Sequence, residues 1–294
     1  MDILQFSQNG RFLMLALDQR GSFRKILNPV SPDAVTDEEI IQVKSEIINA
    51  LQDQFSGILI DPVWGLPAFQ QTSKVFPADV TSASSTSEVK GKPYLLCIEK
   101  SGFEEQERER ITELAYTVPQ LKNLGALGIK LNLNFNPYSL HLENQIGMVK
   151  KVFDDCRQEQ LPFFLEIVTY PFKKYTDKPE LILKAVEIFL QKQIIPDVFK
   201  LEFPGNADAC KKITDILGKI PWILLTLGIP YEIFKKHLQI ACFNGASGFL
   251  AGRSIWQEVG QHRSEAERKK FLQEVAASRF REISNIVRRN TFLT

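Results

Sequence analysis

The chain has 294 residues, of which 44% are hydrophobic and 24% are charged, proportions typical of a globular protein with a large core. The formal net charge is only +1, so no overall electrostatic field favours nucleic acid or an anionic membrane as a partner. We therefore expect neither partner, and we expect any bound anion to be held by a local site.

Apolar runs of strand length recur along the whole chain, and most of them are almost continuously hydrophobic. The runs are Phe12–Asp18, Gly57–Asp61, Tyr94–Glu99, Gly128–Phe135, Pro162–Val168, Val198–Phe203, Trp222–Gly228 and Gly248–Gly252. Continuous hydrophobicity is typical of parallel strands that are covered on both faces. The pattern therefore predicts eight parallel strands.

Segments with a helical pattern separate these runs. They are Asp37–Gln54, Glu105–Leu124, Leu140–Gln158, Pro179–Gln191, Asp208–Leu217 and Tyr231–Phe243, and a charged tail from Ser264 to about Arg289 is expected to form the last helix. Eight alternations of strand and helix predict an α/β protein, a (β/α)₈ TIM barrel that forms a single domain over residues 1–294. An open doubly wound sheet is the alternative, which the lack of a GxGxxG motif after the first strand weakens.

One segment between the second and third predicted strands is rich in serine and threonine. It spans Thr81–Glu88 and is predicted to be a mobile loop. A surface linker is the favoured interpretation, with an active-site lid as the alternative.

The sequence shows no sign of export or of a membrane segment. Cys97, Cys156, Cys210 and Cys242 form no CxxC pair and lie in apolar or helical stretches, which predicts reduced, buried thiols. The N-terminus has no signal-peptide pattern, and no run of about 18 apolar residues occurs. We therefore predict a cytoplasmic location.

Polar side chains gather where the predicted strands end, and barrel active sites lie at the C-terminal ends of strands. The polar residues are Asp18, Gln19 and Arg20 on the first strand, Asp61 on the second, Glu99 and Lys100 on the third, Lys130, Asn132 and Asn134 on the fourth, Glu166 on the fifth, Lys200 and Glu202 on the sixth, and Arg253 on the eighth. The three residues of the fourth strand share one parity and therefore one face. The sequence predicts a polar site at this end of the barrel.

Two lysines, Lys130 and Lys200, lie inside apolar strands, where an unpaired charge is costly. A purely structural pairing with acids is one interpretation. The other is catalytic, because burial and a second ammonium lower the pKa of a lysine, and a neutral amine can attack a ketone. Glu166 on the intervening strand could then move protons during imine formation and hydrolysis.

The ends of the last two strands predict a phosphate site. The seventh strand ends in Thr226, Leu227 and Gly228, and the eighth ends in Gly252 and Arg253. In many barrels the loops at these positions bind phosphate through backbone N–H groups, and a glycine lets the backbone approach the anion. Arg253 could add a bidentate contact. The alternative is that the glycines serve only tight turns.

Short segments in order along the chain resemble the class I tagatose 1,6-bisphosphate aldolase family and its sulfofructose-phosphate aldolase relatives. The segments are LDQRG from Leu17 to Gly21, IDPVWGLP from Ile60 to Pro67, EKSG from Glu99 to Gly102, GIK ending at Lys130, PFFLE ending at Glu166, FKLE ending at Glu202, and GFLAGRSIW ending at Trp256. The resemblance runs from about Leu13 to Trp256. It implies a lyase of carbohydrate metabolism that takes a sugar phosphate.

The resemblance also implies a role for single residues. Lys200 would form the Schiff base and Glu166 would shuttle protons, while Lys130, Asp18 and Gln19 would line the substrate site. The phosphate would be held by the last two strand ends, which contribute Thr226, Leu227, Gly228, Gly252 and Arg253. No metal or other cofactor is expected, and a homo-oligomer is compatible with the family.

The implied reaction cleaves tagatose 1,6-bisphosphate, or a similar ketose, to dihydroxyacetone phosphate and an aldehyde such as glyceraldehyde 3-phosphate. Ile167 stands where relatives usually have proline, and Leu227 stands where they have a small residue. The GASGFLAGR segment around the eighth strand resembles the sulfosugar branch, so a sulfofructose-1-phosphate aldolase that releases sulfolactaldehyde is the alternative. A sugar-phosphate-sensing barrel without catalysis is a second alternative.

A metal-dependent aldolase is a further alternative. Such an enzyme would need histidine side chains as ligands of its metal. The chain has His141, His237 and His262, and all three fall in predicted helical or post-strand segments. We expect them to be surface residues, with no metal site.

Overall fold

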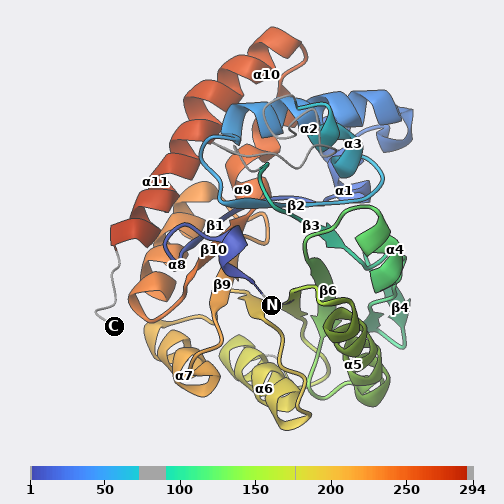
Figure 1. Ribbon diagram of the computed structural model, residues 1–294, viewed down its shortest axis with the longest axis vertical. Helices are drawn as coiled ribbons and strands as arrows, with labels where there is room; N and C mark the ends of the chain where they lie inside the picture. The colour runs from blue at the N-terminus through green and yellow to red at the C-terminus, as the bar shows by residue number, and fades with distance from the viewer. Residues whose placement is uncertain (1, 73–90, 176, 290–294) are drawn as a thin grey trace, which may run out of the picture.

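Eight parallel strands close into a barrel in the computed structural model, which describes residues 2–72, 91–175 and 177–289. Around the barrel the order is β1, β10, β9, β8, β7, β6, β3 and β2, and β2 pairs back onto β1 (Figure 1). The strands are β1 (Phe12–Leu17), β2 (Gly57–Ile60), β3 (Tyr94–Cys97), β6 (Ile129–Phe135), β7 (Phe163–Thr169), β8 (Val198–Leu201), β9 (Trp222–Leu225) and β10 (Gly248–Ala251). The predicted barrel is therefore confirmed, and the open sheet is excluded by this closure.

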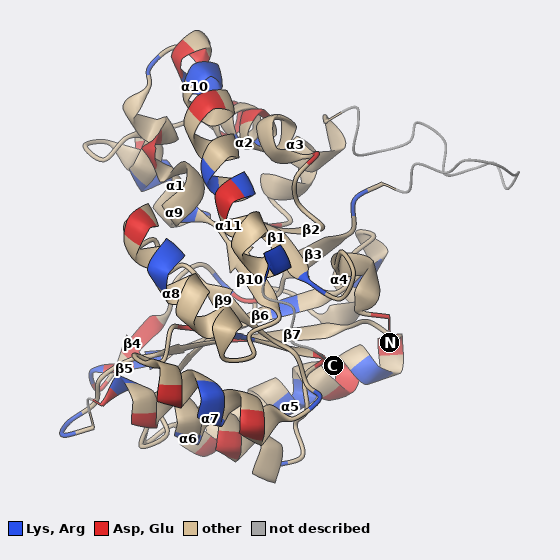
Figure 2. Ribbon diagram, turned by 90° about the vertical axis from the view of Figure 1, so that its left-hand side faces the viewer, with Lys and Arg blue, Asp and Glu red and all other residues tan. Residues whose placement is uncertain are grey.

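Helices surround the barrel and bury their apolar faces against its outer side (Figure 1). They are α1 (Gly21–Leu27), α2 (Asp37–Leu51), α3 (Gly65–Gln70), α4 (Val118–Asn123), α5 (Leu142–Glu159), α6 (Lys178–Gln191), α7 (Ala207–Leu217), α8 (Tyr231–Phe243), α9 (Arg253–Trp256), α10 (Glu265–Phe271) and α11 (Ala277–Arg289). Charged residues recur along helices such as α6 and α7 (Figure 2), and Glu187, Lys211 and Asp215 among them are exposed. A π-helical turn, Leu272–Ala276, joins α10 to α11 within the predicted tail helix.

One helix prediction is wrong in its first half. Residues 105–111 belong to an antiparallel hairpin, β4 (Glu104–Gln106) and β5 (Glu109–Ile111), and the helix begins only at Val118. The run is rich in helix-forming Glu and Arg, but tertiary contacts override this propensity. The buried carboxylate of Glu109 accepts a hydrogen bond from the backbone N–H of Leu140. The segment predicted as a loop, Thr81–Glu88, lies outside the described residues.

The strands are hydrophobic on both faces because the protein has two cores. Side chains that point outward pack against the helices, and side chains that point inward fill the barrel. The inner cluster contains Phe6, Phe12, Met14, Ala16, Leu59, Leu95, Cys97, Phe164, Val198, Ile223 and Leu250. Among the described residues, side chains therefore fill the N-terminal half of the barrel, and the cavity lies at its C-terminal end.

The N-terminal segment closes the bottom of the barrel. A short 3-10 helix, Leu4–Phe6, lies over the barrel centre (Figure 1) and inserts the fully buried ring of Phe6. This ring packs edge-on against Phe164 with 5.5 Å between centroids. The hydroxyl of Ser56 donates a hydrogen bond to the carbonyl oxygen of Phe6, which anchors the segment to the start of β2.

A buried ion pair fastens the C-terminal ends of β1 and β2. Lys44 of α2 pairs with Asp61, both fully buried, and its ammonium also donates to the carbonyl oxygens of Leu17 and Gln19 at 2.9 Å. The Asp61 carboxylate accepts hydrogen bonds from the backbone N–H groups of residues 63 to 65. Because both charges are fully partnered, Asp61 has a structural part here and does not line the cavity above the barrel.

Two further expectations concern thiols and membrane spans. All four cysteines are free and buried, as the sequence predicts. Within residues 2–72, 91–175 and 177–289, the helices lack the length and apolarity that a membrane crossing requires.

Replacing Phe6 with alanine should destabilise the barrel by about 3–5 kcal/mol, because it removes a buried ring and leaves a cavity against Phe164. Urea unfolding followed by circular dichroism measures the effect. Leu4→Ala is the matched control from the same turn, and its 63% exposed side chain should change stability by less than about 0.5 kcal/mol. If the two variants were equally stable, the role of Phe6 in closing the bottom of the barrel would be contradicted.

Candidate active site

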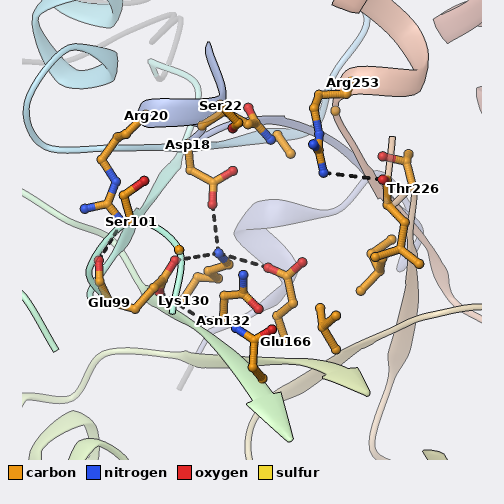
Figure 3. A pocket seen from close by; sticks show the side chains of 18 of the residues that line it. Asp18, Arg20, Ser22, Glu99, Ser101, Lys130, Asn132, Glu166, Thr226 and Arg253 are labelled. Atoms are coloured by element: carbon orange, nitrogen blue, oxygen red, sulfur yellow. Dashed lines mark hydrogen bonds and ion pairs between the residues drawn. The ribbon is translucent and has the colours of Figure 1, made fainter. Parts of the chain in front are cut away.

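A polar cavity of about 580 Å³ opens at the C-terminal ends of the strands (Figure 3). Its walls include nine of the ten residues for which the sequence predicts a catalytic or binding role, namely Asp18, Gln19, Lys130, Glu166, Lys200, Thr226, Leu227, Gly252 and Arg253. The tenth, Gly228, lies directly behind Arg253, since a side chain built on it would meet the guanidinium at 3.1 Å. Residues that are up to 235 positions apart in the chain, Asp18 and Arg253, therefore border one space.

Strand register sets the heights of the polar side chains in the cavity. The Cα atom of Asn132 pairs with that of Glu166, and Glu166 pairs with Lys200, across β6, β7 and β8. Paired residues of parallel neighbours point to the same face, so these three side chains form one inward layer. Lys130 precedes Asn132 by two residues on β6 and lies one layer deeper, at 1% exposure.

The buried ammonium of Lys130 is surrounded by carboxylates (Figure 3). Its Nζ atom lies 2.7 Å from Oδ2 of Asp18, 2.8 Å from Oε1 of Glu99 and 2.9 Å from Oε2 of Glu166. The same Oε2 atom of Glu166 lies 2.9 Å from Nζ of Lys200. One carboxylate oxygen therefore joins the two lysines, and the predicted proximity of Lys130 and Lys200 is mediated by Glu166.

These ion pairs shift the proton affinities of the cluster. Burial lowers the pKa of Lys130, but Asp18, Glu166 and Glu99 outweigh burial and hold that pKa well above its ordinary value. Burial raises the pKa of Glu166, but the charges of Lys130 and Lys200 outweigh it and hold the pKa below its ordinary value. The pKa of Asp18 is lowered by the same two lysines against the same effect of burial. At neutral pH Lys130 is therefore an ammonium, and Asp18 and Glu166 are carboxylates.

The residues predicted to bind phosphate lie in the loops after β9 and β10, and their role stays a prediction. Leu227 and Gly228 both have positive φ angles, 51° and 74°, which turn the chain sharply above β9. Arg253 donates a hydrogen bond of 3.3 Å from Nη2 to the carbonyl oxygen of Leu227, so the guanidinium is fixed against this turn. The Leu227 side chain is 38% exposed and stands at the rim of the cavity.

Little space is left beside the glycine at position 252. A side chain there would meet the carbonyl oxygen of Ala16 at 3.0 Å and Nε2 of Gln19 at 3.2 Å. The amide oxygen of Gln19 is buried and finds no hydrogen-bond partner among the described residues. The backbone of Gly252 and the amide of Gln19 thus meet tightly at the cavity wall.

The opposite wall contains residues to which the sequence analysis gave no catalytic or binding role. Arg20, a predicted polar strand end, donates a 2.6 Å hydrogen bond to the carbonyl oxygen of Glu99, and Ser22 and Ser101 also line the cavity (Figure 3). Glu99 was recognisable as a polar strand end, and Asn132 shares its parity with Lys130. Those two signals could have identified both residues, whereas nothing in the sequence placed Ser22 here.

The structure offers one group of possible metal ligands within the described chain, Asp18, Cys97 and Glu99. The ammonium of Lys130 contacts both of these carboxylates, so a positive charge already occupies their centre. Burial raises the pKa of the Cys97 thiol well above its ordinary value, so it stays protonated. These residues do not fit a metal centre.

The three histidines do not border the cavity. His141 precedes α5, His237 of α8 stacks on Phe203 with 4.0 Å between centroids, and His262 packs near Phe271. Each is half-buried rather than fully exposed. The ligand set that a histidine-bound metal would need is therefore not assembled here by these three residues.

A protein-family model described as DeoC/LacD family aldolase matches residues 12–258 of the chain. The tagatose 1,6-diphosphate aldolase of Streptococcus agalactiae is 26% identical, over 96% of this chain and 93% of that protein. The tagatose 1,6-diphosphate aldolase of a Staphylococcus aureus strain is 28% identical, over 88% of this chain and 85% of that protein.

The fold is also similar to solved structures. An archaeal fructose 1,6-bisphosphate aldolase superimposes with a TM-score of 0.64 at 17% identity, over 96% of this chain and 97% of that one. A Schiff-base-forming fructose-1,6-bisphosphate aldolase gives a TM-score of 0.63 at 17% identity, over 96% and 98%. At such low identity the similarity establishes the barrel fold.

Replacing Lys130 with methionine should destabilise the protein by about 3–5 kcal/mol at pH 7, because buried carboxylates lose their cation. In the native protein the lowered pKa values of Asp18 and Glu166 add stability above the unfolded-state values of about 4, and this stability is lost as pH falls through the folded-state values. In the variant, burial without Lys130 raises those pKa values, so lower pH relieves the destabilisation.

Urea unfolding at pH 7 and pH 5 measures this effect, and the gap between Lys130→Met and the native protein should narrow at pH 5. Lys211→Met is the control, because it breaks an exposed helical pair with Asp215. Its effect should stay below about 0.5 kcal/mol at both pH values. If the difference in unfolding free energy between Lys130→Met and the native protein were the same at both pH values, the charges assigned to Lys130, Asp18 and Glu166 would be contradicted.

Proposed function

The chain belongs to the DeoC/LacD family of aldolases, and we propose that it cleaves a phosphorylated ketose through an imine on Lys200. One observation carries the proposal: Lys200 is 4% exposed and lines the cavity, and its amine lies 2.9 Å from the Glu166 oxygen that also binds Lys130. A buried amine beside a carboxylate can lose its proton and attack a carbonyl carbon. The activity is that of a lyase, and it needs no metal in this scheme.

Imine formation begins when Glu166 accepts a proton from the Lys200 ammonium. The neutral amine adds to the C2 carbonyl of the open-chain ketose and forms a carbinolamine. Glu166 returns its proton to the C2 hydroxyl, which leaves as water, and an iminium remains on Lys200. Lys130 stays protonated throughout, because Asp18 and Glu99 retain their contacts with it. Lys130 therefore orients Glu166 and balances its charge.

Cleavage then uses the iminium as an electron sink. Glu166, again a carboxylate, removes the proton of the C4 hydroxyl, the bond between C3 and C4 breaks, and its electron pair forms an enamine on Lys200. The aldehyde half leaves with its new carbonyl group at C4. Protonation of C3 restores an iminium, and water hydrolyses it to release dihydroxyacetone phosphate and the free amine.

The phosphate next to the ketone would be held by Arg253 and by the backbone around Gly228 and Gly252. Positive charge and glycine backbone at one place support this assignment, and Thr226 and Leu227 form the adjacent wall. Asp18 beside Lys130 and Gln19 beside Gly252 would face the sugar hydroxyls. We propose tagatose 1,6-bisphosphate or a similar ketose bisphosphate as substrate, with glyceraldehyde 3-phosphate as the second product.

Borohydride reduction in the presence of dihydroxyacetone phosphate should trap a covalent adduct on Lys200, because the imine is reduced to a stable amine. Peptide mass spectrometry locates the adduct. Lys200→Met should abolish it, whereas Lys100→Met, at an exposed lysine of the cavity rim, should retain it. A protein that binds the sugar phosphate without an adduct would be a sensor, and this result would refute the imine mechanism.

A substrate panel that compares tagatose and fructose 1,6-bisphosphates with sulfofructose 1-phosphate separates the ketose candidates. The highest kcat/KM should belong to tagatose 1,6-bisphosphate, and EDTA should leave its cleavage unchanged. A preference for the sulfonated ketose would select the sulfosugar alternative.

Arg253→Ala should raise the KM for phosphorylated ketose about tenfold or more, because a charge-assisted hydrogen bond of roughly 1.5–3 kcal/mol is lost. The measurement compares kcat/KM for dihydroxyacetone phosphate and for dihydroxyacetone as donors in the reverse reaction. The advantage of the phosphorylated donor should shrink in the variant. Arg281→Ala, on the exposed side of α11, is the control and should keep the advantage of the phosphorylated donor. An undiminished phosphate advantage in Arg253→Ala would place the phosphate elsewhere.

A further inference from the structure

The side-chain oxygen of Asn132 is a buried acceptor without a donor. No described residue donates a hydrogen bond to its Oδ1 atom, which is shielded from solvent. Leaving such an atom unpaired costs about 1–3 kcal/mol, so buried polar groups normally have a partner in the working protein. Asn132 lines the cavity, and rotation about the broad terminal torsion of its amide would turn this shielded oxygen towards a ligand that supplies the missing donor.

The structural contact made by Asn132 uses its backbone. The backbone N–H of Asn132 donates a 3.0 Å hydrogen bond to Oε2 of Glu99, and any residue except proline could make that contact. The fold therefore explains the strand position but does not explain the amide side chain. The side-chain amide of Asn132 is therefore available to bind a ligand in the cavity.

Register places Asn132 at the end of a row that starts at the reactive amine. Lys200, Glu166 and Asn132 are Cα partners on β8, β7 and β6, and all three line the cavity. Neighbouring strands lie about 4.8 Å apart, and inward side chains converge towards the barrel axis, so their tips lie closer together than their Cα atoms. A ligand bound at Lys200 therefore extends past Glu166 towards Asn132.

The direction of the row decides which half of the ketose meets Asn132. Arg253 and Thr226 lie on one side of Glu166, and Asn132 lies on the other side, next to Lys130 (Figure 3). The proposed function anchors the phosphate at Arg253, C2 at Lys200 and the C4 hydroxyl at Glu166. The next group along the carbon chain, the C5 hydroxyl, would then meet Asn132.

We propose that Asn132 is a specificity-determining residue whose side-chain oxygen accepts a hydrogen bond from the C5 hydroxyl of the ketose. This hydroxyl is the α-hydroxyl of the aldehyde product, so the site selects α-hydroxyaldehydes over aldehydes that lack the group. The inference rests on the proposed function, because it needs C2 to be held at Lys200. A site that satisfies a hydroxyl discriminates against the analogue without one, since its buried acceptor then stays unpaired.

The test uses the reverse reaction, in which dihydroxyacetone phosphate is condensed with glycolaldehyde or with acetaldehyde. These two acceptors differ by the one hydroxyl that becomes the C5 hydroxyl. The native enzyme should have a higher kcat/KM for glycolaldehyde, and Asn132→Leu should reduce the ratio of the two values about tenfold. Asn132→Asp keeps an acceptor oxygen of the same shape and should keep most of the preference.

Two controls accompany these variants. Borohydride trapping with dihydroxyacetone phosphate should persist in Asn132→Leu, because that substrate lacks the aldehyde half, and it reports an intact Lys200 site. If the leucine does not fold, Asn132→Ala removes the same acceptor without added bulk. Asn285→Leu, on the exposed side of α11, should leave activity and preference unchanged.

Each outcome has a defined meaning. A lost preference in Asn132→Leu with retention in Asn132→Asp supports the inference. A native enzyme without preference, or an Asn132→Leu variant that loses kcat but keeps the preference, overturns it and assigns the oxygen to a structural water. If the native protein neither condenses the acceptors nor forms a borohydride-trapped adduct, the proposed function is overturned as well. This result differs from the loss of the Asn132 inference alone, in which condensation and trapping persist.

Discussion

A single carboxylate oxygen of Glu166, shared by the ammonium groups of Lys130 and Lys200, is the contact on which the polar end of this barrel depends. An isolated lysine would be expensive at 1% exposure, and so would an isolated carboxylate beside it. Together with Asp18 and Glu99 the groups satisfy one another, so the cluster persists in a protein interior. The same contact gives Lys200 a proton acceptor within hydrogen-bond distance. Stability and the proposed chemistry therefore require the same geometry.

The barrel supplies that geometry through register. Closure places β6, β7 and β8 side by side, and their pairing aligns Asn132, Glu166 and Lys200 at one height. Backbone hydrogen bonds between the strands fix this alignment. A slip of one residue would turn each inward side chain outward and expose the hydrophobic ones, so the register is strongly specified. The groups proposed to react therefore stand on strands, while the proposed phosphate end consists of the turns after β9 and β10.

Much of this arrangement was predictable from the sequence, and the remainder depends on contacts between distant segments. Continuous apolar runs predicted the strands, and charges within those runs indicated Lys130, Glu166 and Lys200. The hairpin at residues 104–111 was not predictable, because its composition favours a helix and only the buried contact of Glu109 reverses the preference. The bridging position of Glu166 and the unpaired oxygen of Asn132 were equally hidden, since both require the register of three strands.

The ring of Phe6 has a consequence at the opposite end of the molecule. With the N-terminal end filled by Phe6 and the inner core, the described residues leave the cavity open at the C-terminal ends of the strands, where substrates would enter and products would leave. In the proposed reaction one product stays tethered to the floor while the other is free. The aldehyde would therefore leave first, and the covalent bond to Lys200 would hold the other half until water that enters from the same side hydrolyses the imine.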